Sequence, residues 1–153
     1  IGWKLLYYSY ALILPMIILP FSWNLILFAF LCMHFVTGFL VSIIFQIAHI
    51  MPSTEFPLPN KNGEMKECWY GHQLATTTNF SPNNKFLYWL IGGLNYQVEH
   101  HLLPDVCHVH YKGISKIVAE TAGEFGMKYH VKKSLLHAIS DHIKMLKSLG
   151  NNK

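Results

Sequence analysis

The stretch LILFAFLCMHFVTGFLVSIIFQIAHIM, residues 25–51, decides the fold. It has no charged side chain, and no Asp, Glu, Lys or Arg occurs anywhere between Lys4 and Glu55. An α-helix rises about 1.5 Å per residue, so about 20 apolar residues cross the hydrocarbon core of a bilayer. This stretch exceeds that length and is predicted to be a transmembrane helix.

A second apolar stretch, LLYYSYALILPMIILP at residues 5–20, is interrupted by Pro15 and Pro20. Proline is tolerated in a transmembrane helix where neighbouring helices satisfy the freed backbone groups. The residues FSWN (21–24) favour a tight turn at a membrane interface. Residues 1–52 are therefore predicted to form a transmembrane helical hairpin of two spans.

The rest of the chain, residues 53–153, is more polar, and its prolines break the preceding helix. Apolar periodicity predicts helices within 86–103 and 112–126 and from Ser134 onward, with a short extended piece at 127–131. We expect the first of these helices to start near the Gly92–Gly93 pair. Gly126 and Ser134 are the expected caps of the later helices. The predicted fold is an all-α membrane protein, in which a cytoplasmic helical cap follows the hairpin.

Composition agrees with a membrane protein and argues against other classes. Hydrophobic residues make up 52% of the chain, and charged residues only 13%, about half the share of roughly 25% in soluble domains. All the basic residues are lysines, and most lie scattered after residue 60. Scattered lysines argue against a nucleic-acid interface. They favour a cytoplasmic position for this half of a multi-pass protein. The first residue is Ile1, and we expect the chain to be part of a longer protein.

The segment NYQVEHHLLP (95–104) carries the strongest candidate site. On a helix, Gln97, His100 and His101 stand at i, i+3 and i+4 and share one face. Neutral imidazole is the commonest metal ligand, so this face could form half of a metal site. His49 is a further candidate ligand, because an imidazole near the end of an apolar span is costly unless it faces a functional interior. For His100 and His101, the alternative is a pair of surface histidines. For His49, it is a histidine at the membrane interface whose ring is hydrogen-bonded by water.

These residues resemble a known family. GLNYQVEHHLLP resembles the third histidine box, QxxHH, of the membrane-bound fatty acid desaturases, and the match is closest to their front-end group. HQLATTTNFSPNN (72–84), HVHYKGISKIVAETAGEFGMKYH (108–130) and the end of the second span, FQIAH, also resemble that family. The resemblance therefore covers essentially the whole chain.

The resemblance implies a non-haem di-iron enzyme that inserts a double bond into a fatty acyl chain, acyl-CoA or lipid-linked, with dioxygen as co-substrate. It implies that His49, His100 and His101 bind iron, and that Gln97 is a ligand or orients one. Electrons would come from a haem cytochrome or a ferredoxin. The family's first two boxes, HDxxH and HxxHH, do not occur in this chain. We therefore expect activity only from the full-length protein.

The roles of two further polar residues remain open at this point. Asn79 could orient a metal ligand or hold a metal-bound water, or it could simply cap the turn before Ser81 and Pro82. Glu99 points away from the box face, so it could hydrogen-bond a ligand of a neighbouring element or face solvent.

The remaining histidines are not expected to bind metal. His34, in the middle of the second span, suits packing or an interhelical hydrogen bond. His72 lies in a stretch that the family shares, but the family does not require a histidine there. His108 and His110 could hydrogen-bond a metal ligand, although exposed loop positions are expected for them. Surface positions are expected for His130, His137 and His142.

Two other functions remain compatible with the sequence. One is a lipid hydroxylase of the same di-iron membrane superfamily, which would share these histidines. The other is a non-catalytic membrane protein that binds a structural zinc or no metal.

Overall fold

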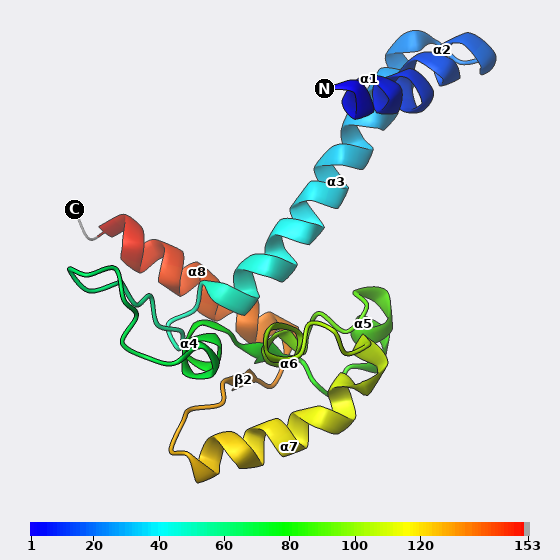
Figure 1. Cartoon of the computed structure of the whole chain (residues 1–153). Helices are drawn as coiled ribbons and strands as arrows, with labels where there is room; N and C mark the ends of the chain where they lie inside the picture. The colour runs from blue at the N-terminus through cyan, green and yellow to red at the C-terminus, as the bar shows by residue number, and fades with distance from the viewer. Residues whose placement is uncertain (152–153) are drawn as a thin grey trace. The chain divides into compact units, whose positions relative to one another are not determined.

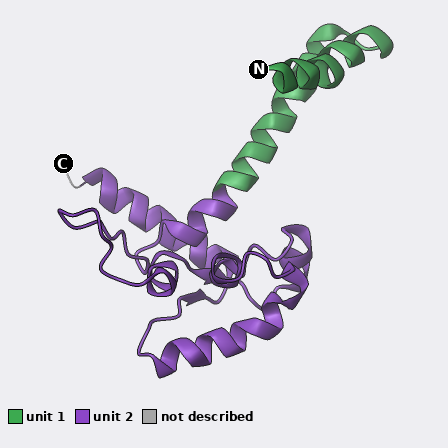
Figure 2. Ribbon diagram, in the orientation of Figure 1, with its two compact units in different colours: residues 1–42 green, residues 43–153 purple. Residues whose placement is uncertain are grey.

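The computed structural model describes residues 1–151, and the described chain is mostly helical (Figure 1). It divides into two compact units, Ile1–Ser42 and Ile43–Lys153 (Figure 2). A helical fold is thus confirmed.

The first unit holds the N-terminal apolar helices and most of the long helix. Its elements are α1 (Gly2–Tyr8), the π-helix η1 (Ser9–Ile13), α2 (Leu14–Ile18) and the start of α3 (Trp23–His49). The π-helical turn lies directly before Pro15, which occupies the first turn of α2. Since proline has no N–H, it cannot continue the regular hydrogen-bond ladder, and a widened turn at this point is the result.

Helix α3 confirms the predicted helix at residues 25–51 with slightly earlier bounds. Within residues 1–151, it is the one helix that is long and apolar enough to cross a membrane, while Gly2–Ile18 is a shorter apolar helix. In the first unit, the Tyr7 hydroxyl lies 3.0 Å from His34 Nε2, and His34 Nδ1 lies 2.9 Å from the Phe30 carbonyl. The interhelical hydrogen bond expected for His34 is confirmed.

The second unit adds five helices, one 3-10 turn and two short strands in the described residues. Figure 1 labels most of them. In chain order they are α4 (Trp69–Thr76), β1 (Asn79–Phe80), α5 (Lys85–Leu90), α6 (Gln97–Leu102), η2 (His108–His110), α7 (Tyr111–Glu124), β2 (Val131–Lys132) and α8 (Leu135–Asn151).

The two strands correct the expectation of a purely α-helical chain. β1 and β2 pair in parallel, with Asn79 opposite Val131 and Phe80 opposite Lys132. The N–H of Asn79 donates to the carbonyl of His130, and the N–H of Ser81 donates to that of Lys132. Buried backbone groups need such partners, and residues 79–81 are buried. Only the extended piece near residue 131 was predicted.

Local signals placed the later helices well and the box helix less well. The N–H of His137 donates to Ser134 Oγ at 3.2 Å, and Gly126 has a φ of 67° just beyond α7, so both predicted caps are confirmed. The box helix begins at Gln97, not at the glycine pair. Gly92 and Gly93 have φ of 59° and 75° and form the turn that ends α5, a conformation that suits glycine.

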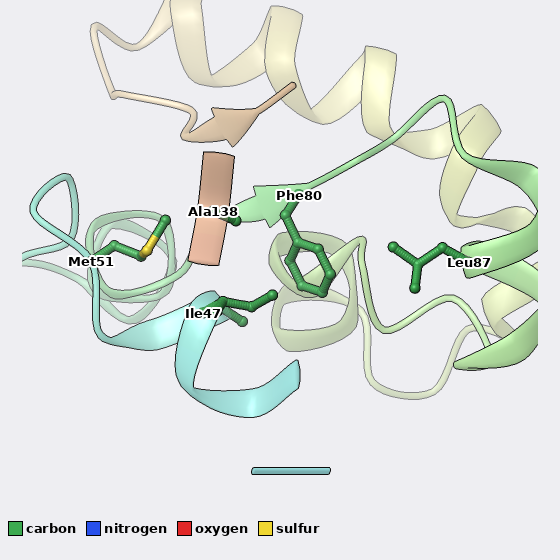
Figure 3. Packing of buried hydrophobic residues seen from close by; sticks show 6 residues of the cluster. Ile47, Met51, Phe80, Leu87 and Ala138 are labelled. Atoms are coloured by element: carbon green, nitrogen blue, oxygen red, sulfur yellow. The ribbon is translucent and has the colours of Figure 1, made fainter. Parts of the chain in front are cut away.

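A small apolar core joins the end of α3 to the rest of the second unit. Ile47 and Met51 pack with Phe80, Leu87 and Ala138, which come from β1, α5 and α8 (Figure 3). A second cluster packs α4, α6 and α7 together through Leu74, Val98 and Ala122. The two clusters together fix the end of α3 and the box helix in one unit.

Two histidines expected at the surface are not there. His142 is only 6% exposed, and its Nδ1 and Nε2 lie 2.8 Å from the Ile50 carbonyl and 3.0 Å from Gln46 Oε1. His130 is half-buried beside the strand pair, whereas His137 is exposed as predicted. The surface prediction was wrong for His142, because α8 packs on the end of α3.

Candidate metal centre

The fold brings His49 from the end of α3 next to the box helix α6. The ring centroids of His49 and His101 are 4.9 Å apart, and those of His100 and His101 are 5.7 Å apart. The Gln97 amide nitrogen lies 3.3 Å from His49 Nε2. All four sequence-predicted ligands therefore belong to one cluster.

Local structure and burial explain how α6 presents its side chains. The predicted helical spacing holds, since Gln97, His100 and His101 all lie within α6. Gln97 is 1% exposed, while the two histidines are half-buried. The polar face of α6 is thus buried at Gln97 and partly exposed to solvent at His100 and His101.

Each histidine of the cluster has a hydrogen-bond partner at Nδ1. His49 Nδ1 donates to the Thr76 carbonyl at 3.3 Å, and His101 Nδ1 donates to Gln73 Oε1 at 2.9 Å. A carbonyl oxygen only accepts, so in both rings the proton is on Nδ1 and the lone pair is on Nε2. Such a partner fixes the tautomer and orientation of a metal-binding histidine.

The third histidine of the cluster has a weaker partner. His100 Nδ1 lies 3.4 Å from the Tyr111 hydroxyl at the start of α7. Sequence analysis missed these partners, Gln73, Thr76 and Tyr111, because they are remote in the chain and have no ligand spacing. Only their place in the segments that resemble the desaturases could have drawn attention to them.

The environment keeps the His101 imidazole in its neutral form. Burial disfavours the imidazolium, and the neighbouring His49 and His100 disfavour a further positive charge, so that the pKa of His101 falls to about 4. At neutral pH the ring is therefore neutral, with its one proton on Nδ1, and the neutral form is the one that binds metals.

Asn79 and Glu99 form a buried network behind α6. The Asn79 amide nitrogen donates to Glu99 Oε2 at 2.8 Å, and the Tyr129 hydroxyl donates to Glu99 Oε1 at 2.6 Å. Asn79 Oδ1 accepts from the Val98 N–H at 2.8 Å. Asn79 is 1% exposed and Glu99 is fully buried, so the solvent-facing alternative for Glu99 was wrong.

The protonation chemistry of this network follows from its burial. Burial raises the pKa of Glu99, and the hydrogen bonds from Tyr129 and Asn79 act in the opposite direction. Burial and the neighbouring carboxyl group also raise the pKa of Tyr129, so its hydroxyl remains a donor. The network holds the backbone and the buried face of α6 in place.

The cluster fits part of a metal centre. Within residues 1–151, no group of three or more His, Cys, Asp or Glu side chains is arranged to hold a metal ion. The donor chemistry nevertheless suits iron, since His49 and His101 are half-buried and each has its lone pair on Nε2. The lone pair of His49 accepts from the Gln97 amide at 3.3 Å. Of the other histidines, His108 and His110 are exposed, while His72 is half-buried with a buried Nδ1 that has no described partner.

Comparison with known proteins bears on the same residues. The model of the fatty acid desaturase family matches residues 1–133. The chain is 40% identical over 147 residues to acyl-lipid (8-3)-desaturase of Physcomitrium patens, a match that covers 96% of this chain and 30% of that protein. It is 38% identical over 151 residues to sn-1 linoleoyl-lipid 6-desaturase of Synechocystis, covering 98% and 42%. No solved structure matches.

A third relative gives the same result. The match to acyl-lipid (8-3)-desaturase of Mortierella alpina is 33% identical and covers 97% of this chain and 33% of the relative. The chain thus spans between 30% and 42% of the length of these three relatives. The resemblance of the histidine box and its flanking segments is confirmed: the chain belongs to the fatty acid desaturase family.

Proposed function

We propose that the full-length protein inserts a double bond into a fatty acyl chain with dioxygen and a non-haem di-iron centre. This chain would contribute His49, His100 and His101 as iron ligands, with Gln97 as a fourth ligand or as a group that orients one. The observation that carries the proposal is the meeting of His49 and His101, whose ring centroids are 4.9 Å apart although they come from α3 and α6.

The proposed reaction needs a metal because an acyl methylene has no useful acidity. When bound, iron supplies the redox chemistry by which dioxygen takes two hydrogens from adjacent carbons. The residues of this chain orient the proposed iron ligands. Gln73 and Thr76 hold the Nδ1 protons of His101 and His49, so that the lone pairs lie on the Nε2 atoms. Asn79 fixes α6 through the Val98 N–H and Glu99.

The relatives' names support a lipid-linked substrate. Two of them are acyl-lipid (8-3)-desaturases, and the third is an sn-1 linoleoyl-lipid 6-desaturase. A substrate held in a lipid also suits an enzyme with a helix long and apolar enough to cross a membrane. The electrons that complete the reduction of dioxygen would come from a haem cytochrome or a ferredoxin.

We also propose that the protein is multi-pass, with residues 1–52 as a two-span hairpin and residues 53–153 as a cytoplasmic cap. The apolar helix Gly2–Ile18 and its hydrogen bond to α3 through Tyr7 and His34 support the hairpin. The excess of lysine after residue 60 supports the cytoplasmic position of the cap.

The test is His101→Ala in the full-length protein, expressed in cells that lack the activity, with acyl products identified by mass spectrometry. We expect the double-bond product to disappear and the iron content of the purified protein to fall. His137→Ala is the control, because His137 is an exposed histidine on α8. Undiminished product from His101→Ala would refute the ligand role, and a hydroxylated acyl product from the unaltered protein would indicate a hydroxylase.

A further inference from the structure

Helix α8 has two apolar faces, and only one is covered by described residues. Its buried face includes Ala138 and His142, at 0% and 6% exposed. A second set of large apolar side chains is turned outward along the same helix. We call this set the outer stripe of α8; its members and exposed fractions are Leu136 (79%), Ile143 (59%) and Leu146 (47%). An amphipathic helix of a soluble domain needs only one apolar face.

Lysine side chains border the outer stripe. Between residues 132 and 150 there are four lysines and one aspartate. Lys132 and Lys144 bind that aspartate, Asp141, at 2.8 and 3.1 Å, and Lys133 and Lys147 are exposed. Lys147 lies one turn after Ile143, directly beside the stripe. The neighbourhood of the stripe therefore carries a net positive charge.

The covered face of α8 is attached to the end of the membrane-spanning helix. Ala138 packs in the cluster that contains Ile47 of α3. His142 bonds the Ile50 carbonyl and the Gln46 side chain, and α8 crosses the last turns of α3 in Figure 1. The end of a spanning helix lies where hydrocarbon gives way to lipid headgroups, so these contacts place α8 near that level.

We propose that the outer stripe of α8 lies on the surface of an anionic lipid bilayer. Apolar side chains that enter the headgroup boundary, bordered by lysines, are the composition of an interfacial helix. Each lysine near a negatively charged leaflet adds attraction, and its aliphatic part can cover apolar surface while the ammonium reaches the headgroups. The inference rests on α3 crossing the bilayer, as in the proposed function.

The test uses the full-length protein with its native cysteines replaced by serine, reconstituted in phosphatidylcholine vesicles with or without phosphatidylserine. An environment-sensitive fluorophore is attached to Ile143→Cys, and a nitroxide is carried on the lipid headgroup region. We expect quenching of about twofold or more at position 143 in the anionic vesicles. Ser148→Cys is the control on the polar side of the same helix, and it should be quenched far less.

The charge dependence gives a second readout. Lys133→Glu with Lys147→Glu should reduce the quenching at position 143 in anionic vesicles to its level in neutral ones. Equal quenching in neutral and anionic vesicles before these substitutions would overturn the electrostatic part of the proposal.

Other outcomes separate the competing occupants of the stripe. A fluorophore at position 143 that reports an apolar site but is not quenched by lipid nitroxide would show that protein covers the stripe. A fluorophore that reports water would show that nothing does, and either result would overturn the proposal. Phe35→Cys, on the 72% exposed Phe35 of α3, serves as the reference. Absence of nitroxide quenching there would contradict the membrane span, whereas absence at position 143 alone contradicts only this inference.

Discussion

At the scale of single residues, the histidines differ in the hydrogen-bond partners of their ring nitrogens. His49 and His101 each donate from Nδ1 to a carbonyl oxygen, of Thr76 and Gln73 respectively. By contrast, His137 is exposed and lies 3.4 Å from the carboxylate of Asp141. A fixed tautomer with the lone pair on Nε2 is what distinguishes a candidate ligand from a surface imidazole.

Replacement of Gln73 by leucine is predicted to weaken iron binding in the full-length protein by about 10- to 100-fold. Without the amide oxygen, the Nδ1 proton of His101 loses its acceptor and the ring is free to turn. Iron per protein after dialysis against a chelator measures the effect. Gln73→Glu is the matched control, since a carboxylate can accept the same bond and should retain more iron. Equal iron in Gln73→Leu and the unaltered protein would contradict the positioning role.

Replacement of Tyr129 by phenylalanine is predicted to lower the free energy of unfolding by about 1–3 kcal/mol. The change removes one of the two side-chain donors to the buried Glu99 carboxyl group. Thermal or denaturant unfolding in detergent measures the loss. Tyr70→Phe is the control, because Tyr70 is 63% exposed; a similar loss there would show that the effect is not due to the network.

At the scale of elements, an ion pair joins β2 to α8. Lys132 Nζ lies 2.8 Å from Asp141 Oδ2, and both side chains are largely buried. The hydrogen bonds from Lys132 and Lys144 hold the pKa of Asp141 below its ordinary value of 3.8. Because the folded state favours the ionised carboxylate, Asp141 stabilises the protein above the ordinary pKa, and the stabilisation is lost as the pH falls through the lowered value.

Replacement of Asp141 by asparagine is therefore predicted to lower stability at pH 7 by up to about 1 kcal/mol. The difference from the unaltered protein should shrink as the pH falls below 4. Thermal midpoints of the two proteins at a series of pH values measure it. Asp105→Asn, at an exposed position, should change little at any pH. A difference that grows in acid would contradict the sign of the pKa shift.

At the scale of the whole molecule, one of the two apolar clusters of the second unit also bears on the candidate metal centre. Phe80 is fully buried and packs with residues of α3, α5 and α8 (Figure 3). It follows Asn79, which holds α6, so the same two-residue strand serves both the core and the candidate metal centre.

Replacement of Phe80 by alanine is predicted to cost about 3–5 kcal/mol, because it removes a buried aromatic ring and leaves a cavity. Denaturant unfolding of the full-length protein measures the cost. Phe125→Ala is the control, as Phe125 is 73% exposed, and a comparable loss there would contradict the proposed importance of the cluster.

Much of the fold could be read from local patterns. The charge-free stretch predicted the long helix, and single residues such as Ser134 and Gly126 marked helix ends correctly. The start of the box helix was misplaced because a glycine pair can either precede a helix or, as here, end the one before it. The strand pair escaped prediction because two-residue strands have no periodicity to detect.

The sequence by itself determined the long apolar helix and the common face of Gln97, His100 and His101, because both depend only on neighbours within a few turns. Only the tertiary structure decided that His49 lies against that face, that Glu99 is buried beneath it, and that His142 is covered by the end of α3. These contacts join residues far apart in the chain, and they depend on how apolar surfaces pack, which no local pattern specifies.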